Sequence, residues 1–169
     1  MNETERNWYA VYTKPKSEKK LNQSLQTKKI QTFLPLLSQK KKWSDRIKIV
    51  EEPIFKSYLF VKINFKEESL EVLKDKNAMQ FVFFNGKPST ISENDISLIE
   101  IFLNEYPEKI KIEELNKLQK GNEVEIQSGP FKGKKAIVEK VKNAYQVILN
   151  IPLLNRVIRL EVAKEVLGF

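Results

Sequence analysis

The chain of 169 residues contains no cysteine and no histidine, and only five of its residues are glycine. Without cysteine there is neither a disulfide framework nor a thiolate metal site. Without histidine, the commonest general acid or base and a main ligand of transition metals are missing. Carboxylate sites for Mg²⁺ or Ca²⁺ stay open in principle, but the sequence predicts no catalytic residue, metal site or cofactor.

Long apolar runs are also missing, and none approaches the roughly 20 residues of a membrane-spanning helix. The first six residues are polar and acidic, unlike a secretory signal. We therefore expect a soluble, cytoplasmic protein without membrane contact. Hydrophobic residues make up 41% of the chain, including ten Phe, which is enough to build the core of one domain or of two small ones.

The net charge of +8 is concentrated in one part of the chain. Between Lys14 and Lys48 there are ten Lys and one Arg against Glu18 and Asp45, and the rest of the chain is close to neutral. Such a local excess is typical of a surface that binds a polyanion. The alternative is a solvated surface in a chain whose basic residues are mostly Lys.

Residues 121–138 have the pattern of a strand, a tight turn and a second strand. Val124 and Ile126 alternate with polar residues, and the segment 128–133 contains two glycines and a proline. This segment resembles the KOW motif of small SH3-like barrels in nucleic-acid-associated proteins; the alternative is an ordinary β-hairpin. The positions that match the motif are Gly121, Val124, Gly129, Phe131, Gly133, Ala136 and Val138.

Hydrophobic periodicity upstream of this motif predicts the element order β-α-β-β-α-β-α. We expect an exposed hairpin or loop at 38–46, a central strand at 58–63, a buried strand at 79–84 and a helix that ends before Pro107. The predicted domains are 1–107 and 118–169, with a mostly charged linker at 108–117. The fold class is α+β, an α/β sandwich followed by a small β barrel.

This domain order resembles the NusG/RfaH family of transcription elongation and antitermination factors, with an NGN domain followed by a KOW barrel. The N-terminal marks are Trp8-Tyr9, the run from Phe55 to Val61, and Gly86-Lys87-Pro88. In one departure, the usual Phe-Pro-Gly-Tyr or Phe-Pro-Asn-Tyr is Phe55-Lys56-Ser57-Tyr58, so the proline-set turn is lost. The spacing from Trp8 to Phe60 is closer to specialised RfaH-like and UpxY-like paralogues than to the general factor.

The resemblance implies that the first domain binds the clamp helices of RNA polymerase through an apolar depression and suppresses pausing or termination. Rigid aromatic side chains suit such an interface. Because side chains alternate along a strand, the core is the alternative location of each. The positions that match polymerase contacts are Tyr12, Phe55, Tyr58, Phe60 and Phe84.

In specialised members a basic surface beside this depression touches the non-template DNA strand. Lys14 matches that pattern, and other lysines lie at the same helix start. Trp43 suits stacking on an unpaired base, although anchoring its hairpin is the alternative. The predicted nucleic-acid-binding residues are Lys14, Lys16, Lys19, Lys20, Lys40, Lys41, Lys42, Trp43 and Arg46.

The resemblance further implies that the KOW domain recruits a ribosomal protein or a termination factor, or no further partner. Glu52 matches a position that forms an interdomain contact in one specialised member, but autoinhibition is not predicted, and we expect a monomer. The acidic pairs, such as Glu51-Glu52, are sequence neighbours whose side chains diverge, so an enzyme is not expected. The alternative function is a ribosome-associated KOW-type RNA-binding protein, which accounts for the charge and barrel but not the first domain.

Overall fold

The computed structural model describes residues 5–114, 122–141 and 144–167. The chain forms two compact units, Met1–Ser92 and Glu93–Phe169, called the N-terminal and C-terminal units below. Among the described residues, no helix is both long and apolar enough to cross a membrane. The predicted fold class is confirmed, because a mixed α/β unit precedes a β-rich unit.

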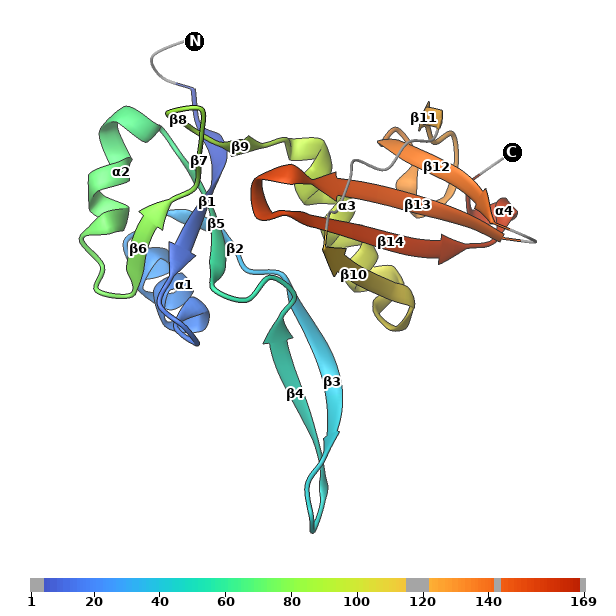
Figure 1. Ribbon diagram of the computed structural model, residues 1–169, viewed down its shortest axis with the longest axis horizontal. Helices are drawn as coiled ribbons and strands as arrows, with labels where there is room; N and C mark the ends of the chain where they lie inside the picture. Colours follow the sequence, from blue (N-terminus) through green and yellow to red (C-terminus); the bar gives the residue numbers. More distant parts are fainter. Residues whose placement is uncertain (1–4, 115–121, 142–143, 168–169) are drawn as a thin grey trace. The chain divides into compact units, whose positions relative to one another are not determined.

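The N-terminal unit is built on an antiparallel sheet in the order β2-β5-β1-β6, with β9 also paired to β1 (Figure 1). Its strands are β1 (Asn7–Thr13), β2 (Gln31–Phe33), β5 (Tyr58–Ile63), β6 (Ala78–Phe81) and β9 (Thr90–Ile91). The helices α1 (Glu18–Thr27) and α2 (Phe65–Leu73) follow β1 and β5, respectively.

Both helices cover one face of this sheet. Leu21 and Leu25 of α1 and Val72 of α2 are fully buried against alternating strand residues such as Val11 and Val61. The four-residue spacing of the two leucines places them on one side of α1, which explains why a mostly polar helix docks on the core. The Asn64 side chain caps α2 by accepting a hydrogen bond from the backbone N–H of Lys66.

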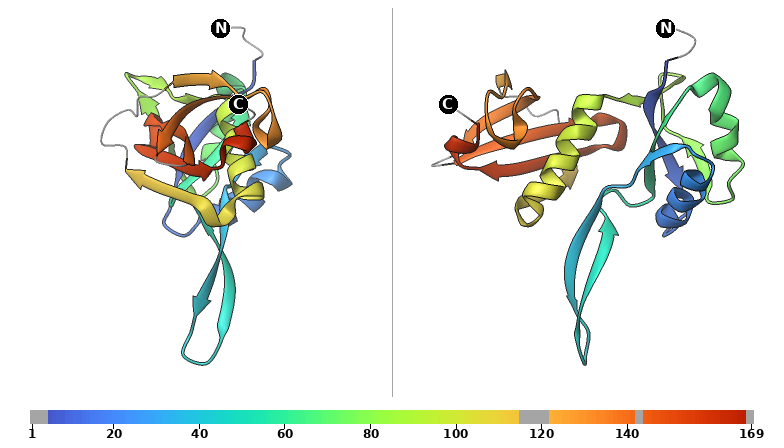
Figure 2. Two further views of the ribbon diagram at one scale, coloured as in Figure 1. Left: turned by 90° about the vertical axis from the view of Figure 1, so that its right-hand side faces the viewer. Right: turned by 180° about the vertical axis from the view of Figure 1, so that it is seen from behind.

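Two hairpins extend this unit beyond the sheet. The strands β3 (Leu36–Lys42) and β4 (Ile47–Pro53) form a long two-stranded ribbon that projects away from the sheet, as both views in Figure 2 show. The prediction of an exposed hairpin at 38–46 is therefore confirmed. The strands β7 (Phe83–Phe84) and β8 (Lys87–Pro88) form the second, shorter hairpin.

The prediction of one buried strand at 79–84 is wrong. Strand β6 ends at Phe81, which is buried, whereas Met79, Phe83 and Phe84 expose 53%, 54% and 72% of their surface. The chain leaves the sheet at Val82 and enters the short hairpin, whose turn has Asn85 and Gly86 at positive φ, as a type I′ turn requires. Apolar composition alone did not reveal this change of direction.

The segment that departs from the family pattern, Phe55-Lys56-Ser57-Tyr58, forms a hydrogen-bonded turn without proline. The backbone N–H of Tyr58 donates to the carbonyl of Phe55 at 3.3 Å, and Ser57 has φ +65°. Ser57 thus adopts the left-handed conformation that glycine or asparagine adopts with little strain. The left-handed backbone of residue 57 is consistent with the Gly or Asn of the family pattern at this position.

Replacing Ser57 with glycine should stabilise the N-terminal unit by about 0.5–1 kcal/mol, because it removes the left-handed strain of a residue with a Cβ atom. Chemical denaturation followed by the fluorescence of Trp8 would measure this change. In the matched control, Lys56→Gly should lower stability by about 0.5–1 kcal/mol. Lys56 does not have a positive φ, so glycine there relieves no strain and only increases the conformational entropy of the unfolded chain. Equal effects from the two variants would contradict the explanation.

The C-terminal unit contains a five-stranded antiparallel sheet in the order β10-β14-β13-β12-β11. Its strands are β10 (Ile110–Glu114), β11 (Asn122–Glu125), β12 (Lys135–Val141), β13 (Ala144–Ile151) and β14 (Arg156–Val162). The helices are α3 (Glu93–Glu105) and α4 (Lys164–Leu167), and the 3₁₀ turns are η1 (Pro107–Lys109), η2 (Gly129–Phe131) and η3 (Pro152–Leu154).

The KOW motif forms the predicted strand, turn and strand. Val124 of β11 pairs with Ala136 of β12, while Phe131 is fully buried in η2. Gly129 has φ +68°, and a Cβ atom there would lie 2.4 Å from the carbonyl oxygen of Val166, so glycine is required for two reasons. Gly133 has φ +76° in open space, Val138 is buried, and Gly121 lies outside the described residues.

The expected linker at 108–117 is not irregular over its described part. Residues 110–114 form β10, which pairs with β14 in the register Ile110↔Leu160. Ile110 and Ile112 alternate with charged residues, a pattern that the high charge of the segment concealed. An ion pair of 3.2 Å between Glu113 and Arg159 adds a polar contact across the pair. The domain boundaries at 107 and 118 remain predictions.

Helix α3 belongs to the C-terminal unit rather than to the N-terminal unit. Its Asn94 side chain forms two hydrogen bonds with the backbone of Lys135 in β12, at 2.9 and 3.1 Å. Phe102 meets Phe131 edge to face at 5.8 Å between ring centroids, and Tyr106 stacks on Phe131 at 5.7 Å. The aromatic residue of the KOW motif therefore anchors a helix that precedes the β-rich sheet.

Candidate functional site

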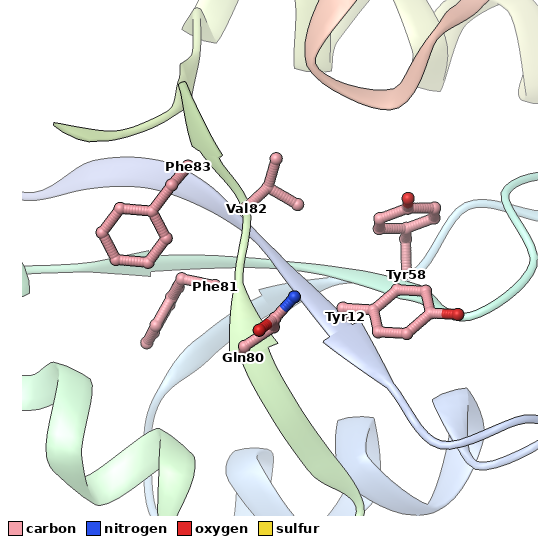
Figure 3. Close-up of a pocket in the computed structure, with 6 residues that line it drawn as sticks. All are labelled: Tyr12, Tyr58, Gln80, Phe81, Val82 and Phe83. Atoms are coloured by element: carbon pink, nitrogen blue, oxygen red, sulfur yellow. The ribbon is translucent and has the colours of Figure 1, made fainter. Parts of the chain in front are cut away.

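An open pair of tyrosines marks one end of the N-terminal sheet. Tyr12 of β1 lies directly opposite Tyr58 of β5, and their ring centroids are 5.4 Å apart in an edge-to-face arrangement. Both side chains are half-buried. They border a depression with a volume of about 500 Å³, called the tyrosine depression below (Figure 3). Its lining residues are Tyr12, Tyr58, Gln80, Phe81, Val82 and Phe83.

Strand pairing and alternation place these side chains. Tyr12 is opposite Gln80 in β6, so the two tyrosines and Gln80 come from three neighbouring strands. Figure 3 shows the tyrosine rings on one side of β6 and the rings of Phe81 and Phe83 on the other. Phe83 also contacts Phe65 of α2, at 6.3 Å between ring centroids. The result is a concave surface with aromatic walls and a single amide group.

A buried carboxylate holds the turn next to Tyr58. Glu18 is only 6% exposed, and its carboxylate accepts a hydrogen bond of 2.6 Å from the backbone N–H of Ser57. The carbonyl of Ser57 in turn accepts a 2.8 Å hydrogen bond from the N–H of Thr13. The start of α1, the end of β1 and the turn before β5 are thereby tied together. This connection positions the tyrosine pair beside the basic start of α1.

The five predicted polymerase contacts are not brought together. Tyr12 and Tyr58 lie side by side, but Phe55 and Phe60 are 3% and 0% exposed. Phe60 packs in an aromatic cluster with Phe33 and Phe55, at centroid distances of 6.1 and 6.0 Å. Phe60 shares a sheet face with Tyr58, yet coverage along that face ends before Tyr58. The location of Phe55 and Phe60 in the core corrects the expectation that they offer an open contact surface.

Phe84 is 72% exposed but does not line the depression, because it lies on the β7–β8 hairpin opposite Lys87. Sequence reasoning missed four of the lining residues: Gln80, Phe81, Val82 and Phe83. The signal for Gln80 and Val82 was present, since they lie two residues apart on the opposite face from the buried Phe81. Phe83 could not be found in this way, because the strand ends before it.

The basic residues of the β3–β4 hairpin divide between its two faces. Directly opposite residues share a face, so Lys40 and Lys42 lie with Ile49 and Ile47. Lys41 and Lys48 are opposite each other on the other face. Trp43 is 56% exposed in the tip turn, where its backbone N–H donates to the carbonyl of Arg46 at 2.8 Å. The side chain of Trp43 is therefore available rather than packed as an anchor.

Lysines from separate segments surround one carboxylate at the base of this hairpin. The Nζ of Lys41 pairs with Glu52, and this hydrogen bond is the largest of the effects that lower the pKa of Glu52. The charges of Lys56 and Lys19 lower the same pKa further. The basic start of α1, the 55–58 turn and the hairpin are thus electrostatic neighbours. In this structure, Glu52 pairs within its own hairpin.

The predicted basic residues at the start of α1 are exposed: Lys14 and Lys16, which precede the helix, and Lys19 and Lys20 within it. Sequence reasoning missed Lys48 and Lys56. Lys56 replaces the proline of the family pattern and so had a signal, whereas Lys48 needed the hairpin register. Together these residues offer cations to a polyanion beside an aromatic depression. Among the described residues, no three acidic side chains gather in a way that would hold a metal ion.

Comparison with known proteins shows which family this chain resembles. The model described as "Transcription termination factor nusG" matches residues 6–100, more than half of the chain. Two curated relatives, the transcription termination/antitermination proteins NusG of Chlamydia trachomatis and Chlamydia muridarum, are each 28% identical over 143 residues. Those alignments cover 79% of this chain and 78% of each relative. A solved structure titled "Domain interaction in Thermotoga maritima NusG" has a TM-score of 0.48 at 20% identity and covers 96% of both chains.

Proposed function

Because this chain belongs to the NusG family of transcription termination and antitermination factors, we propose that it binds RNA polymerase through the tyrosine depression and suppresses pausing or termination. The observation that carries this proposal is the open, edge-to-face pair of Tyr12 and Tyr58 at the rim of an otherwise well-packed sheet. Half-buried aromatic side chains lose little entropy on binding and bury a large area, so they suit a protein interface.

The partner surface that fits this depression is a convex apolar one. A helical pair such as the polymerase clamp helices has this shape, and the family resemblance suggests the same partner. Gln80 lines the depression and offers one amide to a polar group of the partner. Phe55 and Phe60 support the depression from the core rather than contact the partner.

The basic residues beside the depression support a contact with nucleic acid. Lys19 of α1, Lys41 of the hairpin and Lys56 of the 55–58 turn all come within electrostatic range of Glu52 near the hairpin base. Such residues bind the phosphate backbone without reading base identity, while Trp43 at the tip suits stacking on an unpaired base. We assign this surface to the non-template DNA strand. This contact, together with the altered 55–58 turn, favours a specialised, operon-specific factor.

The C-terminal unit is proposed to recruit a second partner, a ribosomal protein or a termination factor. Lys132, Lys134 and Lys135 follow the buried Phe131, and Lys132 and Lys134 are positioned by the glycine-containing turn that ends at Gly133. A factor of this kind would act as a monomer in the cytoplasm, where RNA polymerase and ribosomes are both present. This role leaves the polymerase contact entirely with the N-terminal unit.

Binding of the purified full-length chain to core RNA polymerase at low salt tests the proposal. Tyr58→Glu should weaken binding by about 30-fold or more, because an interface hot spot contributes about 2 kcal/mol or more and a charge would enter an apolar contact. Pause suppression in a single-round transcription assay should fall in parallel. Tyr58→Phe is the matched control and should retain binding, since it keeps the ring.

Two results would overturn the proposal. One is the absence of any binding between the wild-type chain and core polymerase at low salt. The other is unchanged binding by Tyr58→Glu with an unchanged thermal midpoint. Co-sedimentation with ribosomes free of polymerase would instead favour the ribosome-associated alternative.

A further inference from the structure

The β3–β4 hairpin presents an apolar strip that the nucleic-acid contact does not use. Ile47 and Ile49 are 69% and 64% exposed, among the most exposed large hydrophobic residues of the described chain. They lie two residues apart on one strand and therefore on the same face. Lys42 and Lys40 stand directly opposite them on β3. We call this four-residue surface the isoleucine face.

The strip is not explained by folding. From Lys41 to Ile49 every residue of the hairpin is exposed, so neither face of the ribbon covers a core (Figure 1). Threonine has the same branching at Cβ and would form the strands equally well, without exposing a large apolar side chain to water. Adjacent exposed isoleucines at the far part of a projecting ribbon are typical of an interaction surface.

Its chemistry differs from that of the opposite face. There, Lys41 and Lys48 are directly opposite each other, like charges in that position repel, and the Nζ of Lys41 pairs with Glu52 on the same face. The isoleucine face instead alternates branched aliphatic side chains with the long stems of two lysines. Isoleucine offers neither a flat ring for stacking nor a donor for phosphate. The two faces therefore suit different partners.

We propose that the isoleucine face docks on RNA polymerase, on an apolar strip bordered by carboxylates, as a second contact separate from the tyrosine depression. This inference rests on the proposed function, because it assumes that polymerase is the partner. Among the described residues, Lys40 and Lys42 form no ion pair within 4 Å, so both cations are free to meet acidic groups. Charge complementarity at the rim would fix the register of the hairpin on the partner.

The same charges argue against a second copy of this chain. A twofold interface places the same patch on both partners, so two isoleucine faces would bring four lysines together, while the carboxylate of Glu51 on the same face lies outside the four-residue strip, toward the hairpin base. The distance from the hairpin base supports a separate contact. Ile47 and its partner Lys42 lie at the last pair of a ladder whose first pair is Leu36 and Pro53. The ladder has seven pairs, and the six steps of about 3.3 Å between its first and last pair carry the strip about 20 Å outward.

Two linked contacts reinforce each other, because binding at the first raises the effective concentration at the second. The test uses the full-length double variant Ile47→Thr/Ile49→Thr and core RNA polymerase without nucleic acid. We expect the dissociation constant for polymerase to rise about 10-fold. Affinity for a single-stranded oligonucleotide should stay within about twofold, since the opposite face and tip are untouched. The milder variant Ile47→Val/Ile49→Val should fall between wild type and the threonine variant.

The matched control is Lys41→Gln/Lys48→Gln, which changes the other face of the same hairpin. It should weaken oligonucleotide binding and leave the affinity for core polymerase within about twofold. The backbone hydrogen bonds of the hairpin, read from amide exchange of residues 38–51, should persist in both variants. This measurement separates the loss of a contact from the loss of the ribbon.

Several outcomes would overturn the inference. The first is that the threonine variant binds polymerase as tightly as the wild type, and the second is that it loses oligonucleotide affinity as much as polymerase affinity. The third is that the wild type forms concentration-dependent dimers that the threonine variant does not form. The fourth is that the chain binds vesicles of phosphatidylglycerol and phosphatidylcholine through the two isoleucines. If Tyr58→Glu abolishes polymerase binding while the threonine variant retains it, the docking face is wrong but the proposed function stands. If the wild-type chain fails to bind polymerase, both are wrong.

Discussion

Replacing Phe60 with alanine should destabilise the N-terminal unit by about 3–5 kcal/mol. Phe60 is fully buried, stacks on Phe33 at 6.1 Å and meets Phe55 edge to face at 6.0 Å. The truncation removes these contacts and leaves a cavity that neighbouring rings fill only in part. Because small units have a stability of about 5–15 kcal/mol, a large fraction of the total would be lost.

Urea denaturation monitored by tryptophan fluorescence would measure this loss. Phe84→Ala is the matched control, since Phe84 is 72% exposed and its truncation should change stability by no more than about 0.5 kcal/mol. Phe60→Ala should reduce polymerase binding only in proportion to the unfolded fraction. A stable Phe60→Ala variant that has lost polymerase binding would mean that Phe60 is a contact residue after all.

Replacing Phe131 with alanine should destabilise the C-terminal unit by a similar amount, about 3–5 kcal/mol. Phe131 is fully buried between the rings of Phe102 and Tyr106, at 5.8 and 5.7 Å between centroids. The unit spans only the residues after Ser92 and contains a single sheet, so its own stability is limited. We therefore expect most of the variant's C-terminal unit to be unfolded near body temperature.

Amide hydrogen exchange in β12, β13 and β14 would detect this unfolding. Phe131→Leu should cost less than about 1.5 kcal/mol because it conserves apolar volume, and Tyr106→Phe should leave protection unchanged because the ring stack persists. If Phe131→Ala accelerates exchange only in α3, the ring anchors the helix without supporting the sheet. That result would contradict its assignment as the centre of this core.

Gly129 and Gly133, the two glycines in the turn of the KOW motif, illustrate how far a motif can be interpreted. Their positive φ angles were predictable, because a turn between two alternating segments needs residues without a Cβ atom. The close approach of the Val166 carbonyl to Gly129 was not, since Val166 lies 37 positions away in sequence. Local conformation follows from local sequence, whereas steric exclusion between distant segments does not.

The aromatic residues of the N-terminal sheet show the same division at the candidate site. Alternation correctly implied that Tyr58 and Phe60 share a face, and strand pairing adds Tyr12 to it. It did not reveal that coverage of this face ends between Phe60 and Tyr58, which leaves the two tyrosines half-exposed. Likewise, the run of apolar residues after Met79 gave no sign that the chain leaves the sheet at Val82.

The sequence by itself determined the class of protein, through a KOW motif behind an α/β pattern and a basic excess between Lys14 and Lys48. It also determined the absence of thiol and imidazole chemistry. Only the tertiary structure decided which of these residues meet: Glu18 with Ser57, Lys19 and Lys56 around Glu52, and the isoleucines opposite Lys40 and Lys42. The physical reason is that periodicity defines the faces of a single strand or helix. Register and burial, which arise from pairing between distant segments, decide which face is covered and which groups converge.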